Sequence, residues 1–515
     1  MNCGQKQLTL LLCSFFMAAA LGLFLLNAWK SLSVPLGLMG DHLRYQRAAD
    51  FHRGAVGFPG WVEYECREEI NKHPLYIITL SRIRRWGLDI PRLSLFLVLL
   101  SAAVVSLMVR NISGTSAGLL AGGLFLASPF VLSQTLVFAS HGHLGLLFTL
   151  LAFWIAVSGR AHSVLFACLL GVFSAAAVLA SFHSLLLVIP LMAVEVIFRL
   201  RRKRAALGAA LAGVLMVILP LFFLHPQMNI NLYGDKIREL VQDNVNSAQI
   251  FGRHYSLPLF LAFESENGVY SLTILFFLVI STLLALTRRK AKKTLHARTL
   301  LIVVTTAFIL FEMLAVKLDR VYYPVWVAMI AFSTSGVIIF FQDIGRRDLR
   351  WVVPVLCFIL MLGYWAPASQ TIVSTCRAGI ELFPTEESRR GVFIAGDGNA
   401  RPLDLPLERD AVSRDDVKYL ILRKYTLPPA PLSSFDNPDS RRLVIAARLY
   451  EELMRAEGIQ HLQCWRTRPQ FYYFSEDNYT YYRQGWWRPG PSLVVPAELY
   501  RKTRDAITQQ LYPDL

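Results

Sequence analysis

Long apolar runs separated by short polar segments recur along the first 370 positions of the chain. Each run approaches the roughly 20 residues that a helix needs to cross ~30 Å of hydrocarbon. Isolated strands cannot satisfy their backbone groups in lipid, and these runs lack the alternation of a β-barrel. The pattern predicts an α-helical polytopic membrane protein with about eleven transmembrane helices. The expected spans are 8–29, 93–109, 116–134, 143–158, 163–179, 183–199, 206–224, 270–286, 299–316, 323–341 and 351–368.

Basic residues cluster in three short loops between these spans, at 199–204, 287–298 and 345–350. If the helices alternate in direction, all three loops lie on one side, which the positive-inside rule makes cytoplasmic. The N-terminus is then cytoplasmic, and the C-terminal region is periplasmic or extracellular. We expect a multi-pass protein of the bacterial inner membrane. The first apolar run is too long for a signal-peptide core and lacks an A-x-A-like site, so we interpret it as a membrane anchor.

The composition excludes a protein that is water-soluble over its whole length, because 54% of the residues are hydrophobic and the mean hydropathy is +0.43. The net charge of +16 is explained by the short juxtamembrane loops, which face anionic lipid headgroups. We therefore expect the lipid bilayer, and no nucleic acid, as a partner.

The membrane domain, residues 1–368, is expected to carry a catalytic first outer loop at 30–92 and a second long outer loop at 225–268. Residues 369–515 are expected to form an extracytoplasmic soluble domain. The soluble region has strand-like pieces at 391–395 and 419–423 and a helical stretch around 440–457, which predicts an α/β domain. Its crowded aromatic residues suit either a domain core or contacts with sugar rings. Its two cysteines, Cys376 and Cys464, could form a disulfide or remain thiols, and the chain has no C-x-x-C pair typical of zinc sites.

The first outer loop holds the richest set of polar residues. Asp41 follows the first span closely and precedes Arg44 and Tyr45, which would share its face in a helix. A carboxylate near the apolar boundary is costly unless it is paired or used, so Asp41 is a candidate catalytic residue. The alternative is that Asp41 only caps a helix over 42–52.

The far end of the loop contains the sequence Asn71-Lys72-His73-Pro74-Leu75-Tyr76. An early Asp at the start of the first outer loop, with a K-P-P-L-Y-like motif at its end, resembles the GT-C superfamily of lipid-dependent glycosyltransferases. The protein mannosyltransferase and aminoarabinose transferase branch is the most similar. In this chain His73 replaces the first proline of the motif.

Two later segments agree with the resemblance in their order and sidedness. Ser128-Pro129-Phe130 and the region of His141-Gly142-His143 resemble the short second outer loop, although histidines stand where an acidic residue is common. The stretch from Lys317 to Pro324, with Asp319, Arg320 and Tyr323, resembles an E-R-Y-x-x-P-like motif.

The resemblance implies transfer of a sugar from a polyprenyl-phosphate donor to an extracytoplasmic glycan, lipid or protein acceptor, with inversion. Asp41 would be the general base, and Lys72 and Arg320 would bind the donor phosphate. For these two, the alternatives are a snorkelling lysine and an Asp319–Arg320 ion pair. No cofactor is required, but a divalent metal could bind near Asp41 and the two histidines. The expected substrate-binding residues are Arg44, Tyr45, His73, His141, His143 and Tyr323.

Three other classes of protein remain open. A transporter or flippase of lipid-linked sugars would explain the many helices, but it predicts inverted repeats and charges at the bilayer midplane. An O-antigen ligase or polymerase would use the same carrier, with its large outer loop between spans rather than at the terminus. A membrane-anchored binding or assembly protein would need none of the polar motifs.

Overall fold

The computed structural model describes most of the membrane region and parts of the C-terminal region. The described residues are 3–31, 41–54, 60–87, 90–137, 141–158, 163–198, 200, 203–224, 268–287, 301–307, 309, 316–317, 319–343, 350–370, 392–395, 419–422, 438–462, 471–472 and 492–513. The expected outer loop over 225–268 therefore lies almost wholly outside them, as do Cys376 and Cys464.

The described part of the membrane region is almost entirely helical, as predicted for a polytopic α-helical membrane protein, whereas the number of transmembrane helices stays a prediction. Five of its helices are long and apolar enough to cross a membrane, and shorter apolar helices lie between them. Helices cover the expected spans wholly or in part, because lipid leaves an isolated chain no other way to pair its backbone groups. The apolar helices of the described membrane region, long and short together, are α1 (Cys3–Ser31), α5 (Ile90–Ser113), α6 (Thr115–Ala127), α7 (Pro129–Val137), α8 (His141–Val157), α9 (Val164–Ala180), α10 (Leu185–Phe198), α11 (Arg204–Leu224), α13 (Gly268–Thr287), α15 (Asp319–Asp343) and α16 (Val352–Leu360). A 3₁₀ turn, η3 (Phe182–Ser184), precedes α10, and a π-helical turn, η7 (Met361–Trp365), continues α16.

The prediction of one continuous helix over 116–134 was wrong. The structure ends α6 at Ala127, leaves Ser128 extended with φ −66° and ψ 117°, and begins α7 at Pro129. Proline disfavours the helical conformation in the residue before it and suits the first turn of a new helix. The break lies in the stretch that resembles the second outer loop.

Small residues allow close contact between several of the membrane helices. A β-carbon added to Gly213 on α11 would meet the carbonyl oxygen of Cys168 on α9, and one added to Gly171 would meet that of Ala210. Hydroxyl groups add cross-links between helices: Ser281 Oγ donates to the Ser333 carbonyl at 2.8 Å, from α13 to α15. Association in lipid relies on close packing and interhelical hydrogen bonds of this kind.

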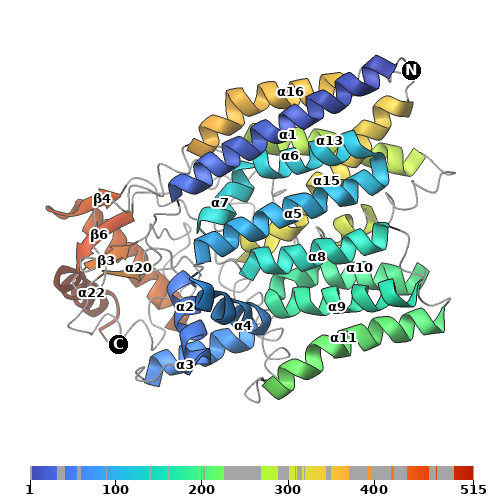
Figure 1. Cartoon of the computed structure of the whole chain (residues 1–515). Helices are drawn as coiled ribbons and strands as arrows, with labels where there is room; N and C mark the ends of the chain where they lie inside the picture. The colour runs from blue at the N-terminus through green and yellow to red at the C-terminus, as the bar shows by residue number, and fades with distance from the viewer. Residues whose placement is uncertain are drawn as a thin grey trace.

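Where the structure describes it, the first outer loop contains three shorter helices, α2 (Asp41–His52), α3 (Gly60–Lys72) and α4 (Pro74–Ile83), and α4 continues into the 3₁₀ turn η2 (Arg84–Trp86). Figure 1 shows α2, α3 and α4 at one end of the bundle, the end at which the strands of the C-terminal region also lie. The N-terminus of α1 lies at the opposite end. This arrangement is the one expected if the loop and the C-terminal region share a side of the membrane.

The C-terminal region contains a four-stranded sheet with the strand order β2-β3-β6-β4. β2 (Val392–Ala395) runs parallel to β3 (Tyr419–Leu422), and β6 (Ser492–Pro496) pairs antiparallel with both β3 and β4 (Gln460–Leu462). The helices α20 (Pro438–Arg455) and α22 (Ala497–Leu511) pack with β6 around a small apolar core. β2, β3 and α20 lie where the sequence predicted strands and a helix, β4, β6 and α22 were not predicted, and the domain boundary at 369 stays a prediction.

A second, two-stranded pairing links distant parts of the chain. β1 (Val316–Lys317) pairs antiparallel with β5 (Phe471–Tyr472), with Val316 opposite Tyr472 and Lys317 opposite Phe471. Phe471 and Tyr472 thus lie beside the residues that come just before α15.

Candidate active site

The two ends of the first outer loop meet through aromatic rings. Tyr45 on α2 contacts His73 with ring centroids 5.7 Å apart and Tyr76 with centroids 5.5 Å apart, both edge to face. All three side chains are buried. The early segment that begins at Asp41 is therefore packed directly on the motif that contains Lys72.

Local sequence explains how this motif forms the start of a helix. His73 has a non-helical backbone (φ −136°, ψ 54°), and Pro74 then occupies the first turn of α4, where its missing N–H is not needed. The apolar residues at helical spacing, Tyr76, Ile77 and Leu80, form the buried face of α4. Gly87, with φ 72°, ends the segment in a left-handed conformation that favours glycine.

Lys72 is neither a free surface lysine nor a cation standing alone. Its Nζ lies 2.6 Å from Oε1 of Glu68 and 3.7 Å from Oε1 of Glu69, both on its own helix α3. The side chains of Lys72 and Glu68 are about three-quarters buried, at 24% and 23% exposed. A donor phosphate at Lys72 would therefore compete with, or displace, a carboxylate.

A second cluster joins the second outer turn to the start of α15. His143, in the first turn of α8, is buried and contacts the ring of Tyr323 edge to face at 5.3 Å. Its Nε2 lies 3.2 Å from the carbonyl oxygen of Gln134 on α7. Because a carbonyl only accepts, the tautomer with the proton on Nε2 makes this bond and leaves Nδ1 as an acceptor.

Tyr323 brings a buried hydroxyl to this cluster. Its ring also contacts Phe130 at 6.0 Å, and the side chain is 2% exposed. Its hydroxyl is buried and has no hydrogen-bond partner within the part of the chain that the structure describes. An unsatisfied buried hydroxyl is costly, so it is well suited to bind a hydroxyl or phosphate oxygen of a substrate.

Four predicted site residues have a described backbone position but side chains outside the described set. Asp41 is the first residue of α2 and Arg44 lies in the same turn, while His141 is the first residue of α8 and Arg320 the second of α15. Asp41, Arg44 and Tyr45 occupy one face of α2 by their spacing, as predicted. The roles of Asp41 and Arg320 stay predictions.

A metal site gains no support from the residues that are described. No group of three or more His, Cys, Asp or Glu side chains among them could hold a metal ion. His141 and His143 both lie within helical α8, so a helical Gly142 leaves them on different faces. A divalent metal would need the side chains of Asp41 and His141, which lie outside the described set.

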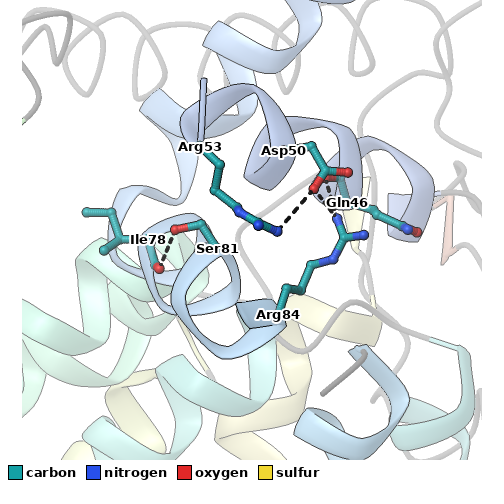
Figure 2. A network of polar contacts seen from close by, with 6 residues as sticks. All are labelled: Gln46, Asp50, Arg53, Ile78, Ser81 and Arg84. Atoms are coloured by element: carbon teal, nitrogen blue, oxygen red, sulfur yellow. Dashed lines mark hydrogen bonds and ion pairs between the residues drawn. The ribbon is translucent and has the colours of Figure 1, made fainter. Parts of the chain in front are cut away.

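An ion pair that the sequence did not reveal holds α2 against the end of α4. Arg84 Nη1 lies 2.6 Å from Oδ1 of Asp50 and also donates to the backbone carbonyl of Gln46 at 3.2 Å. Figure 2 shows Arg84 reaching across from η2, while Arg53 approaches the same carboxylate from the end of α2 at 3.9 Å. Asp50 and Arg84 are 34 positions apart (84 minus 50), so no local pattern pointed to the pair. By contrast, the i, i+4 spacing of Glu68 and Lys72 was a readable signal.

No protein-family model matches the chain, and no curated protein sequence matches it. Among solved structures, the chain is similar to the crystal structure of ArnT from Cupriavidus metallidurans bound to undecaprenyl phosphate. The two share 14% sequence identity with a TM-score of 0.46, and the alignment covers 71% of this chain and 75% of that chain.

Proposed function

We propose that the protein is a membrane glycosyltransferase that transfers a sugar from a polyprenyl-phosphate donor to an extracytoplasmic acceptor. The observation that carries the proposal is the contact of Tyr45 with His73 and Tyr76. It places the helix that begins at Asp41 against the motif that contains Lys72. The resemblance assigns the first segment to the acceptor and the second to the donor. Without that contact, the two ends of the loop would be unrelated polar segments.

The proposed reaction is a single displacement at the anomeric carbon. Asp41 takes the proton of the acceptor hydroxyl or amine as the acceptor oxygen or nitrogen bonds to the sugar. The bond from the sugar to the carrier phosphate breaks, and the phosphate leaves as an anion that Lys72 and Arg320 stabilise. Attack opposite the leaving phosphate inverts the configuration.

The substrate-binding residues divide between the two clusters. In the first, Arg44, Tyr45 and His73 lie on or against α2. In the second, His141, His143 and Tyr323 lie at the starts of α8 and α15. The buried hydroxyl of Tyr323 supports a role for the second cluster in binding a polar ligand.

The test is transfer by purified protein in lipid nanodiscs, with a labelled polyprenyl-phosphate sugar as donor and release of the sugar-free carrier as the readout. Asp41→Asn is expected to abolish release while the protein remains inserted and folded. The control is Glu63→Gln, an exposed carboxylate of the same loop that pairs with Arg67 on its own helix. Near-normal release of carrier by Asp41→Asn would refute the role of Asp41 as the general base.

The same labelled donor, with the protein in proteoliposomes instead of nanodiscs, tests the alternative of a flippase or transporter. A flippase would move the labelled lipid between leaflets of a proteoliposome and leave the bond between sugar and phosphate intact. If the carrier were never released and the intact lipid moved between leaflets, the transferase proposal would be wrong and the flippase alternative would take its place.

A further inference from the structure

We propose that Arg84 is a positioning residue that sets the orientation of α2, and with it the place of Asp41 relative to the Lys72 motif. The catalytic consequence rests on the proposed function. Arg84 itself lies at the far end of α4 from that motif and is not expected to touch the substrate.

The guanidinium of Arg84 holds α2 at two points. It pairs with Oδ1 of Asp50 at 2.6 Å and donates to the carbonyl oxygen of Gln46 at 3.2 Å, one helical turn earlier. A contact to a side chain and a contact to the backbone together restrain both the rotation and the sliding of a helix. Hydrogen bonds with an ionised donor are also shorter and stronger than neutral ones.

Tyr45 supplies the third point of attachment. Its ring packs on His73 and Tyr76, at the opposite end of α4 from Arg84. Tyr45 and Asp50 are five positions apart, about 7.5 Å along the axis of α2, so these contacts restrain the helix at two separate levels. Helix α2 is thus tied to α4 and η2 along its length, from Tyr45 to Asp50.

The position of Asp41 makes it sensitive to this restraint. It lies four positions before Tyr45, about 6 Å along the helix axis at ~1.5 Å per residue. If Arg84 were lost, α2 could tilt about the Tyr45 contact, and a tilt of about 10° would move Asp41 by about 1 Å. A misplacement of that size can cost on the order of 100-fold in rate.

The exposure of the pair separates positioning from simple stabilisation. The side chains of Arg84 and Asp50 are 22% and 31% exposed, so solvent screens the pair in part. Solvent-exposed ion pairs contribute about 0–1 kcal/mol to folding free energy, and partial screening moves this pair toward that range. Loss of Arg84 should therefore lower kcat for transfer strongly, while the melting temperature changes little.

The test compares Arg84→Ala, Asp50→Ala and the double variant in the nanodisc transfer assay. Arg84→Ala is expected to lower kcat by about ten-fold or more, with the KM for the carrier lipid within about two-fold of wild type. The double variant is expected to be no slower than the slower single variant, because both substitutions remove the same contact. The conservative Arg84→Lys keeps the positive charge but lacks the planar guanidinium with its several donors. Its kcat should therefore lie between those of Arg84→Ala and wild type.

Arg53→Ala is the matched control. Arg53 is an arginine at the end of α2 that approaches the same carboxylate at 3.9 Å, but it does not connect α2 to another element through that contact. Its loss should leave kcat within about two-fold of wild type, as for most exposed ion pairs. An equal loss of kcat in Arg53→Ala, or an unchanged kcat in Arg84→Ala, would overturn the proposal.

Amide hydrogen exchange gives a readout that does not depend on transfer. Arg84→Ala should increase exchange in peptides from α2 and leave those from α5 unchanged. If wild-type protein released no carrier, the proposed function would fail, whereas increased α2 exchange would still support the restraint by Arg84. Unchanged α2 exchange in Arg84→Ala would overturn the restraint whatever the activity.

Discussion

Tyr45 and Tyr76 meet edge to face, with ring centroids 5.5 Å apart and ring planes at 89°. The two residues come from opposite ends of the first outer loop, and each is buried. Edge-to-face pairs gain energy beyond the burial of their area, because the positive edge of one ring meets the negative face of the other. The contact therefore holds the two halves of the candidate site together.

Replacement of Tyr45 by alanine should remove this contact, lower the unfolding free energy of the protein and impair transfer. Truncation of a buried aromatic side chain typically costs about 3–5 kcal/mol of unfolding free energy. Tyr45→Phe keeps the ring and both ring contacts, so it should retain most of the stability. Thermal unfolding in detergent, followed by tryptophan fluorescence, measures the difference, and equal melting temperatures for the two variants would contradict it.

Removal of the carboxylate beside Lys72 should improve binding of the donor. Glu68 Oε1 lies 2.6 Å from Lys72 Nζ, so Glu68→Gln weakens the competitor that a donor phosphate must displace. We expect the KM for the carrier lipid to fall several-fold in Glu68→Gln. Lys72→Met should raise it by about ten-fold or more, the loss expected for a charged hydrogen bond of about 1.5–3 kcal/mol.

Both KM values come from the initial rate of carrier release against donor concentration. The opposite pattern, with weaker binding in Glu68→Gln and normal binding in Lys72→Met, would show that Lys72 serves only the local ion pair.

The contact between α9 and α11 should not tolerate a larger residue at Gly213. A β-carbon there would meet the carbonyl of Cys168, whereas one at Gly208 on the same helix meets nothing within 4 Å. Gly213→Ala should lower stability by about 1–3 kcal/mol, as overpacking of a close contact does. Gly208→Ala should be neutral or slightly stabilising, because alanine favours helix by about 0.5–1 kcal/mol over glycine. Unfolding in detergent distinguishes the two, and similar losses would argue against this helix contact.

Tyr270 contributes a hydrogen bond between α13 and α6 that can be removed without changing the packing. Its hydroxyl donates to the carbonyl of Leu124 at 2.6 Å, and the side chain is fully buried. Tyr270→Phe should lower the unfolding free energy by about 0.5–1.5 kcal/mol. The rings that Tyr270 contacts are those of Trp326 and Trp365, which are not among the candidate site residues. We therefore expect kcat for transfer to stay near wild type, and a large loss of kcat would place Tyr270 closer to the site than the structure does.

Much of the membrane fold was determined by the sequence itself. Apolar runs such as that of α5 must be helical in lipid, since no water is present to satisfy a backbone in any other conformation. The helix of α2 and the start of α4 at Pro74 also follow from local spacing and from the restrictions of proline. The same rules should have predicted the break at Ser128, where hydropathy alone suggested one continuous span.

Only the tertiary structure decided which polar residues meet. The contact of Tyr45 with His73 and Tyr76, and the pair of Asp50 with Arg84, join positions about thirty residues apart across a bend of the chain. Such contacts depend on how amphipathic helices dock on one another, and each of these helices could bury its apolar face in several orientations. Hydrophobic periodicity determines which face of a helix is buried. The element against which that face packs is determined by specific side-chain contacts, and those contacts exist only once the helices have packed.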